Sequence, residues 1–298
     1  MKILVTGANG LLGQKLVSLL QEKEDIELIA TARGKSVQTI TRGTFYMLDV
    51  TDKNQVDTLI SATKPDVIIH TAAMTQVDDC ETKRDACVLN NVTAIEHLIE
   101  ACSKNGVHLV HVSTDFIFDG THGPLDETAE PNPVNFYGES KLAAERLIQA
   151  SNISWSILRT VLVYGVTNDM SRSNIVLWVK KSLEDGKTIS VVNDQWRTPT
   201  LAEDLAQGCY LAAVKKATGV FNISGKDFVT PFDIATQTAT FFKLDTSLIQ
   251  PTDSTKFRQP ARRPMKTGFI IDKAKKELGY EPHSFLEGLE ILSKQLTH

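Results

Sequence analysis

Short hydrophobic runs rich in β-branched residues alternate with amphipathic stretches of helical period along the first half of the chain. The first run, Lys2–Thr6, leads through a glycine-rich turn into a helical stretch at Leu11–Glu22. Further strands are predicted at Ile26–Thr31, Thr44–Leu48, Asp66–Thr71, Val107–Ser113 and Ser154–Arg159. The helices predicted between them are Asp52–Thr63, Arg84–Lys104 and Tyr137–Gln149. This alternation predicts an α/β fold, a doubly wound parallel sheet of the Rossmann type with helices on both faces.

The turn after the first strand contains three glycines, at Gly7, Gly10 and Gly13. Gly7 can adopt the backbone angles of a tight turn, Gly10 keeps side-chain atoms away from a pyrophosphate, and Gly13 lets the helix lie close to the sheet. The free N–H groups at the start of that helix then face an anion. Such turns also serve simple chain reversal, but the position between the first strand and helix predicts a dinucleotide site.

Beyond Gly165 the pattern is less regular, and two basic, proline-bounded segments at 195–200 and 256–264 interrupt it. The elements predicted here are helices at Asn174–Glu184, Ala202–Lys215, Pro231–Phe242 and Phe285–Gln295 and a strand at Val220–Ile223. We expect a smaller α/β substrate domain that is partly interleaved with the nucleotide domain. The nucleotide-binding domain would comprise residues 1–165 and roughly 187–222, and the substrate domain roughly 166–186 and 223–298.

Composition and charge narrow the choice of partners. The chain has 298 residues, with 32 Lys and Arg against 36 Asp and Glu, for a net charge of −4. This balance does not favour a nucleic-acid partner or an anionic membrane, and no apolar segment approaches the roughly 20 residues that span a bilayer. We therefore expect a soluble, cytoplasmic protein. The four cysteines lack zinc-ligand spacing, and His108 and His111 would face opposite sides of one strand, so no metal site is expected.

Tyr137 and Lys141 lie four residues apart at the start of a predicted helix, so their side chains project from one face. An ammonium group near a phenol favours the phenolate and lowers the tyrosine pKa from about 10. The preceding strand ends in Ser113, Thr114 and Asp115, which places hydroxyl groups at the carboxyl edge of the sheet. Either feature alone could be coincidental, the hydroxyls serving only a strand-end turn. Together they predict a site that reduces a carbonyl group, whose oxygen gains charge during hydride attack.

The segment Phe116–Phe136, FIFDGTHGPLDETAEPNPVNF, follows that strand directly and breaks the alternation. Open α/β sheets bind ligands at this edge. We therefore expect a lid or a substrate-contacting loop, with an inert connection as the alternative.

Five segments, in order along the chain, resemble the extended short-chain dehydrogenase/reductase family: TGANGLLG, Asp49–Val50, HTAAMTQVDDCE, STDFIFDG and PNPVNFYGESKLAAE. Within that family they are most similar to the dTDP-4-dehydrorhamnose reductase group. Segments 194–206, DQWRTPTLAEDLA, and 262–280, RRPMKTGFIIDKAKKELGY, resemble later motifs of the same group. The resemblance therefore extends from Met1 to the C-terminus.

The resemblance implies roles for individual residues. Tyr137 would donate the proton, Lys141 would adjust its pKa and bind the nicotinamide ribose, and Thr114 would hold the substrate oxygen. Ser113 and Asp115 would support Thr114 and contact the substrate. The residues implied to contact the cofactor are Gly7, Asn9, Gly10, Leu11, Leu12, Gly13, Arg33, Asp49, Val50, Ala72, Ala73, Met74, Tyr137 and Lys141.

The second strand ends in IELIATARGK, with Arg33 and Lys35 and no acidic residue at its tip. An acid at this position accepts hydrogen bonds from the ribose of NAD, whereas a cation suits the 2′-phosphate of NADP. NADPH is therefore the expected cofactor. NADH is the alternative, since an arginine in a turn can simply face solvent.

Substrate recognition is less defined. In the dTDP-4-dehydrorhamnose reductase group, the segment after the sixth strand resembles RTSWVYG, whose tryptophan packs against the sugar. The corresponding segment of this chain is RTVLVYG, with Leu162 in place of the tryptophan. A leucine lacks the broad face of an indole, so the identity of the sugar is left open. Arg197 and Arg263, with Arg262, could bind a diphosphate or could be ordinary surface or interdomain charges. Asn90 matches a polar supporting position of the family.

The predicted function is an NADPH-dependent reduction of a nucleotide-linked 4-keto-6-deoxy sugar, as in dTDP-rhamnose biosynthesis. One alternative is a nucleotide-sugar epimerase or dehydratase of the same family, which returns the hydride and consumes no NADPH. The other is a non-catalytic NADP-binding regulatory subunit similar to that of methionine adenosyltransferase, acting on a partner enzyme. Homodimer formation is expected by analogy with relatives.

Overall fold

The computed structural model describes residues 1–168, 174–256 and 259–297. In this part of the chain a seven-stranded parallel sheet has the order β10-β6-β5-β4-β1-β2-β3. Its strands are β1 (Lys2–Thr6), β2 (Glu27–Ala32), β3 (Thr44–Met47), β4 (Val67–His70), β5 (His108–Thr114), β6 (Trp155–Thr160) and β10 (Gly219–Asn222). Each lies within one residue of its predicted bounds. The winding reverses between β1 and β4, as in a Rossmann-type sheet, so the predicted fold class is confirmed.

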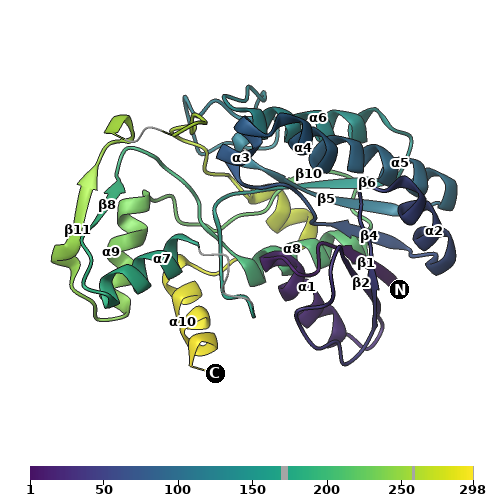
Figure 1. The fold of residues 1–298 in the computed structure, drawn as a ribbon, viewed down its shortest axis with the longest axis horizontal. Coiled ribbons are helices and arrows are strands. Elements are labelled where there is room, and N and C mark those ends of the chain that lie inside the picture. Colours follow the sequence, from purple (N-terminus) through teal and green to yellow (C-terminus); the bar gives the residue numbers. More distant parts are fainter. Residues whose placement is uncertain (169–173, 257–258, 298) are drawn as a thin grey trace.

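Helices cover both faces of the sheet (Figure 1). They are α1 (Leu11–Gln21) and α8 (Ala202–Lys215) on one face, and α2 (Lys53–Thr63), α5 (Ala94–Asn105) and α6 (Phe136–Ala150) on the other. Successive strand residues point to opposite layers: Ile3 and Val5 pack with α1 and α8, whereas Leu4 packs with α2 and α5. The sheet therefore has two buried cores, and its carboxyl edge is left for a ligand.

The helix predicted over Arg84–Lys104 is present as a continuous run of α4 (Arg84–Val88), a π-helical turn, η1 (Leu89–Thr93), and α5. The π-helical turn and an additional short helix before the run, α3 (Val77–Thr82), were not predicted. The hydrogen bonds of a π-helical turn span five residues, which shifts the side chains that face a neighbouring element. Because α3, α4 and η1 all pack against α6, this shift reaches the candidate site.

A smaller region lies beside the large sheet, at the left of Figure 1. It contains α7 (Ile175–Glu184), α9 (Pro231–Phe241), α10 (Phe285–Leu296) and the parallel strands β8 (Ile189–Val192) and β11 (Ile249–Thr252). The helices match the prediction, but β8 and β11 were not predicted. A second short pair, β7 (Val163–Tyr164) with β9 (Thr200–Leu201), was also missed.

The two regions are more interleaved than expected. Residues 187–192 were assigned to the nucleotide domain, yet β8 pairs with β11 in the smaller region. Conversely, Phe269, Ile271 and Tyr280 were assigned to the substrate domain but pack in the core beneath the large sheet. The division into a nucleotide-binding and a substrate domain stays a prediction. In the structure, residues 189–192 pack with the smaller region, and Phe269, Ile271 and Tyr280 pack with the large sheet.

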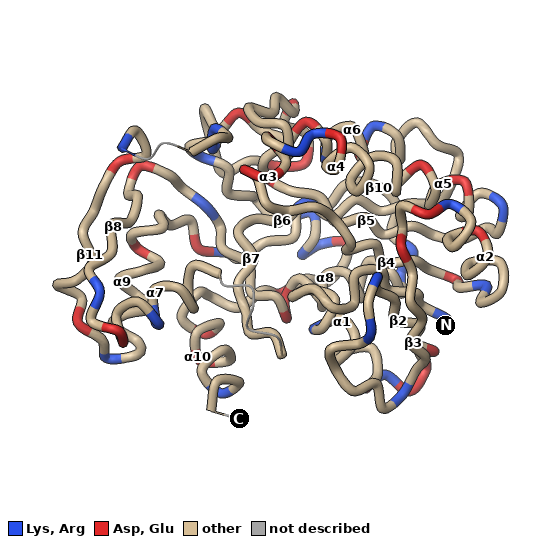
Figure 2. Tube along the Cα trace, in the orientation of Figure 1, with Lys and Arg blue, Asp and Glu red and all other residues tan. Residues whose placement is uncertain are grey.

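Basic and acidic residues are interspersed over both regions (Figure 2). Among the described residues, no helix is long and apolar enough to cross a bilayer.

Candidate active site

The glycine turn joins β1 to α1 and approaches the end of β4. Gly7 has φ +71°, and a Cβ atom there would lie 2.8 Å from the backbone nitrogen of Ala72. A Cβ atom on Gly13 would lie 2.1 Å from the carbonyl oxygen of Gly7, so only glycine lets α1 begin this close to the strand. Within the described part of the chain, a Cβ atom on Gly10 would meet one atom within 4 Å, the Gly7 oxygen at 3.3 Å. The turn is thus tight on its protein side and open at Gly10, which fits a pyrophosphate.

The start of α1 provides donors for an anion. The first hydrogen bond of the helix joins the Gln14 N–H to the Gly10 carbonyl at 2.9 Å. The N–H groups of Leu11, Leu12 and Gly13 precede it and therefore have no acceptor within the helix. These are the residues that the sequence predicts at the cofactor phosphates.

Asn9 ties the loop after β2 to this turn. Its side-chain Nδ2 donates to the Lys35 carbonyl at 2.8 Å, and its Oδ1 accepts from the Val37 N–H at 3.2 Å. The exposed side chains of Arg33 and Lys35 belong to the same loop. Asn9 therefore fixes the backbone of the loop that carries the two residues predicted to select NADPH.

The segments after β3 and β4 are fixed by local hydrogen bonds. The Asp49 carboxylate accepts from the backbone N–H of Thr51 at 2.9 Å and from its hydroxyl at 2.7 Å, and Val50 is buried. Ala72 and Ala73 follow β4 and are partly buried. These segments at the strand ends carry residues that the resemblance implies at the cofactor, and that role stays a prediction.

The supporting amide was predicted one residue too early. Buried Asn91 accepts from the Met74 N–H at 2.8 Å and donates to the Met74 carbonyl at 3.0 Å. Asn90 instead donates to Ala86 in its own helix at 2.8 Å. The π-helical turn η1 turns Asn91 toward β4. The spacing of Asn91 from the buried Ile95 and Leu98 of α5 is a signal that could have identified it.

Thr114 and Tyr137 meet at the carboxyl edge of the sheet. Thr114 ends β5 and accepts a hydrogen bond from the Phe116 N–H at 3.2 Å. Tyr137 lies in the first turn of α6, and a Cβ atom on Gly138 would lie 2.1 Å from the Phe116 carbonyl, so the helix begins directly against the strand end. The Phe116 ring packs edge-on against Tyr137 at 5.9 Å. Both predicted hydroxyl groups are thereby buried beside each other.

The electrostatics of the pair differ from the expectation that Lys141 lowers the pKa of Tyr137. Burial raises the pKa of the phenol, the Thr114 hydroxyl acts in the opposite direction, and the charge of Asp115 raises the pKa further. Lys141 is directed elsewhere, since its Nζ donates to the Val112 carbonyl at 2.8 Å. The reason is desolvation, which disfavours the phenolate. Burial thus favours the protonated phenol of Tyr137.

Asp115 and Arg197 form a buried pair behind Thr114. The Arg197 Nε lies 3.7 Å from Asp115 Oδ2, and Thr267 donates a hydrogen bond to the same oxygen. Burial raises the pKa of Asp115, while the charge of Arg197 and the bond from Thr267 act against this. Arg197 also donates to the Met265 carbonyl at 3.0 Å, so its guanidinium joins separate segments. Ser113 is buried, and its Oγ has no hydrogen-bond partner among the described residues.

The other substrate residues have structural partners as well. Arg263 forms two hydrogen bonds of 2.6 and 2.8 Å with the Asp78 carboxylate, and Arg262 is exposed. Leu162 has φ +38° at the break between β6 and β7, where its carbonyl accepts from the Thr200 N–H at 3.2 Å. Diphosphate binding by Arg197 or Arg263 stays a prediction, and both side chains already serve internal contacts.

The long loop after β5 is held against the C-terminal segment. The Leu125 N–H donates to the Gly268 carbonyl at 2.7 Å, and the Leu125 carbonyl accepts from the Ile270 N–H at 2.8 Å. A further bond of 3.0 Å joins the Lys266 N–H to the Gly120 carbonyl. The loop is therefore held in place by the C-terminal segment, and its predicted contact with substrate stays a prediction.

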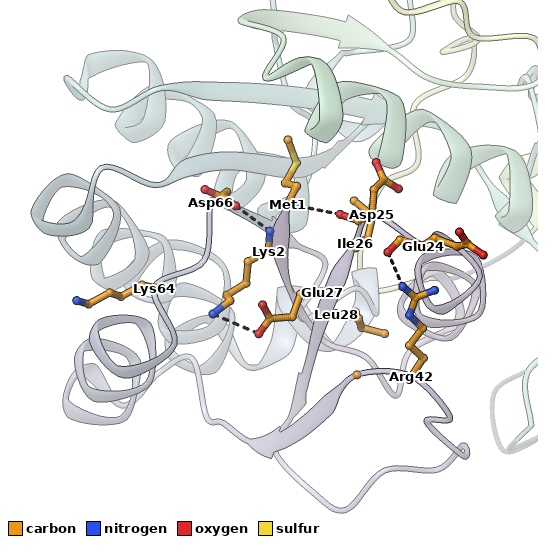
Figure 3. Close-up of a pocket in the computed structure, with 11 residues that line it drawn as sticks. Met1, Lys2, Glu24, Asp25, Ile26, Glu27, Leu28, Arg42, Lys64 and Asp66 are labelled. Atoms are coloured by element: carbon orange, nitrogen blue, oxygen red, sulfur yellow. Dashed lines mark hydrogen bonds and ion pairs between the residues drawn. The ribbon is translucent and has the colours of Figure 1, made fainter.

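A hollow of about 550 Å³ lies at the opposite edge of the sheet, where β1 and β2 begin (Figure 3). Several of its charged groups have partners: the Met1 ammonium donates to the Asp25 carbonyl at 2.7 Å, and Lys2 pairs with Glu27 at 3.2 Å. Ligands of open α/β sheets bind at the carboxyl ends of the strands. This hollow is therefore not the candidate active site.

The fold, the glycine turn and the Thr–Tyr–Lys arrangement define an extended short-chain dehydrogenase/reductase, a class of NAD(P)-dependent oxidoreductases. More narrowly, the chain belongs to the family described as the RmlD substrate binding domain, whose model matches residues 1–298.

Three relatives illustrate the range of this family. The chain is 31% identical over 277 residues to the probable low-salt glycan biosynthesis reductase Agl14 of Haloferax volcanii, covering 92% of this chain and 91% of that protein. It is 31% identical over 255 residues to methionine adenosyltransferase 2 subunit beta of Xenopus laevis, covering 84% and 75%. A solved dTDP-4-dehydrorhamnose reductase from Bacillus anthracis, in complex with NADP, is 27% identical with a TM-score of 0.84 and 99% coverage of each chain.

Proposed function

We propose that this protein is an NADPH-dependent reductase acting on the keto group of a nucleotide-linked 4-keto-6-deoxy sugar. The observation that carries the proposal is the meeting of the Thr114 hydroxyl and the Tyr137 phenol at the carboxyl edge of the sheet, one helical turn from Lys141. The reductases among the relatives support the same reaction class.

The residues around the glycine turn fit a dinucleotide. Gly10 leaves space beside the first N–H groups of α1, and Asn9 fixes the backbone of the loop that carries Arg33 and Lys35. Arg33 and Lys35 would pair with the 2′-phosphate, and the turn would hold the pyrophosphate. Bound NADPH would supply the hydride to the keto carbon.

Side chains of the protein would supply the proton and stabilise the developing negative charge. Burial keeps Tyr137 protonated, so its phenol can pass a proton to the substrate oxygen as that oxygen gains negative charge. Thr114 would donate a hydrogen bond to the same oxygen and hold it against Tyr137. The cluster of Cys80, Cys87 and Tyr137, with Phe116 and Met74 beside it, keeps water from the phenol.

The test of the proposal is a turnover assay of the purified chain with NADPH and a dTDP-linked 4-keto-6-deoxy sugar. We expect NADPH oxidation that requires the sugar, with a 4-hydroxy sugar as product. Product formation without net NADPH consumption would indicate the epimerase or dehydratase alternative. No turnover, together with co-purification of a methionine adenosyltransferase, would favour the regulatory role suggested by the subunit beta relative.

Arg33→Ala is expected to weaken NADPH binding about tenfold and to leave NADH binding unchanged, because one charge-assisted contact to the 2′-phosphate is lost. Isothermal titration with both cofactors measures the change. Arg42→Ala is the matched control, since Arg42 is also exposed but lies at the opposite edge of the sheet. Equal weakening of NADPH and NADH binding by Arg33→Ala would contradict a 2′-phosphate contact.

A further inference from the structure

A row of buried polar side chains crosses three neighbouring strands and ends at Lys141. Thr6, His70 and His111 are paired in register on β1, β4 and β5, on the face covered by α2, α5 and α6. The Thr6 hydroxyl lies 2.7 Å from His70 Nδ1, and the two imidazole rings stack with centroids 5.5 Å apart. His111 Nε2 lies 3.1 Å from Lys141 Nζ. The row thus extends from Thr6, directly before the glycine turn, to Lys141 on α6, the helix that also carries Tyr137.

Burial favours the neutral form of both imidazoles of the row. Burial lowers the pKa of His70 to about 3 and that of His111 well below its usual value, and the charge of Lys141 acts in the same direction. A neutral imidazole accepts a hydrogen bond from an ammonium group through its unprotonated nitrogen. The hydrogen bond from Lys141 to Nε2 therefore places the proton of His111 on Nδ1.

That Nδ1 atom is buried and has no hydrogen-bond partner among the described residues. An unpaired buried N–H group costs stability, which an apolar side chain at this strand position would avoid. The imidazole of His111 is thus poorly explained by folding. Its Nε2 atom, however, can accept a hydrogen bond from the Lys141 ammonium group.

Two acceptors fix the Lys141 ammonium. His111 Nε2 at 3.1 Å and the Val112 carbonyl at 2.8 Å each take one N–H, and the side chain is 3% exposed. An ammonium group has three N–H donors, so one is left for the cofactor ribose or the phenol one turn earlier on α6. Orienting that third donor requires both acceptors.

We propose that His111 is a positioning residue of the reductase reaction, which holds the Lys141 side chain in place through Nε2. The kinetic consequence rests on the proposed function, because Lys141 acts on Tyr137 and the cofactor only in that reaction. The contact itself can be tested without turnover.

Removing the His111 acceptor is expected to change the pKa of Lys141. Burial lowers the pKa of Lys141 to about 8, and the groups that act in the other direction are Glu145 on α6 and the thiols Cys87 and Cys80 on α4 and α3. Glu145 itself is bonded to Arg159. A hydrogen bond to the ammonium favours its charged form, so loss of the His111 acceptor lowers the pKa of Lys141 further.

The variants are His111→Phe, which keeps a ring and removes the acceptor, and His111→Gln, which keeps an acceptor. In His111→Phe we expect kcat to fall about tenfold and the alkaline limb of the pH profile of kcat/KM to move down by roughly one pH unit, the size expected for one hydrogen bond to a charged group. His111→Gln is expected to restore both. The KM for NADPH should change little in either variant.

His108→Phe is the matched control. His108 is equally buried on the same strand but faces the other side, where it contacts the hydroxyls of Ser154 at 2.6 Å and Ser156 at 2.9 Å. We expect this variant to lose stability and to keep the alkaline limb of the wild type. A shift of that limb in His108→Phe as large as in His111→Phe would show a general effect of strand damage and overturn the proposal.

A second readout does not depend on catalysis. Nuclear magnetic resonance of chain labelled at the lysine ε-carbon gives the pKa of Lys141 directly, its signal identified by its loss in Lys141→Arg. We expect that pKa to fall by about one unit in His111→Phe and to be retained in His111→Gln. An unchanged pKa in His111→Phe would overturn the proposal. Absence of turnover by the wild type would instead reject the proposed function and leave this titration to decide the role of His111.

Discussion

Replacing Tyr137 with phenylalanine is expected to lower kcat by two to four orders of magnitude, because the phenol is the proposed proton donor to the reduced oxygen. The side chain is buried and packs edge-on against Phe116, so phenylalanine fills the same space. Steady-state rates with saturating NADPH and keto sugar measure the loss. NADPH affinity, measured by fluorescence titration, should stay within about threefold of the wild type, since we propose that the cofactor binds mainly at the glycine turn.

The control for this variant is Tyr210→Phe. Tyr210 lies on α8 beneath the ammonium of Lys23, away from the carboxyl edge, and the same hydroxyl is removed. We expect its turnover to equal that of the wild type. Full activity of Tyr137→Phe would remove the proposed proton donor and with it the assignment of the site.

The pH profile checks the protonation of Tyr137 independently. Burial raises the pKa of its phenol above the usual value of about 10, so the donor stays protonated through the neutral range. The pKa of Lys141, by contrast, is lowered to about 8 by burial. We therefore assign the alkaline limb of reductase activity to Lys141 and expect it to persist in any residual activity of Tyr137→Phe.

The large sheet was predictable because its strands are short apolar runs separated by amphipathic helices. All seven strands follow this rule, and the turn at Gly7, Gly10 and Gly13 adds a local backbone requirement that only glycine meets. The short strands that were not predicted show no comparable pattern in the sequence. β8 and β11 are four residues each and pair across about 60 intervening positions, so their pairing depends on tertiary packing.

The site was predictable in its residue types and less so in their contacts. Thr114 and Tyr137 come together because a parallel strand and the following helix share one edge, which follows from the fold. Spacing along the chain does not reveal that Lys141 turns to His111, or that η1 selects Asn91 over Asn90. Nor does it show that Arg197 pairs with a buried carboxylate, because that requires segments far apart in sequence.

The anchoring of α6 on β6 leads to the second large expected effect. Arg159 and Glu145 face each other in the core, with Nη2 and Oε2 2.7 Å apart and side chains 4% and 1% exposed. The Arg159 guanidinium also lies over the Phe118 ring at 5.4 Å. Because Glu145 follows Lys141 by one helical turn, we expect the pair to fix how α6 packs on β6 and thereby the positions of Tyr137 and Lys141.

Glu145→Leu is expected to lower the free energy of unfolding by about 3–5 kcal/mol, because it leaves the Arg159 charge buried without its partner. Arg159→Met should lower the free energy of unfolding by a similar amount, because it leaves the Glu145 carboxylate buried without its partner. The double variant should recover most of the loss, since two apolar side chains replace the pair and no charge is stranded. Urea unfolding followed by circular dichroism gives all three values and the coupling energy of the pair.

A surface pair separates this effect from the loss of any salt bridge. Lys180 and Glu184 form an i,i+4 pair on α7 with side chains 23% and 46% exposed, so Glu184→Leu should leave the unfolding midpoint nearly unchanged. If the double variant Glu145→Leu with Arg159→Met were as unstable as the sum of the singles, the two side chains would contribute independently. Shape and packing, and not a stranded charge, would then hold α6 in place. If the double variant is stable but slow, the buried charges are needed for the alignment of Tyr137 and Lys141 rather than for folding.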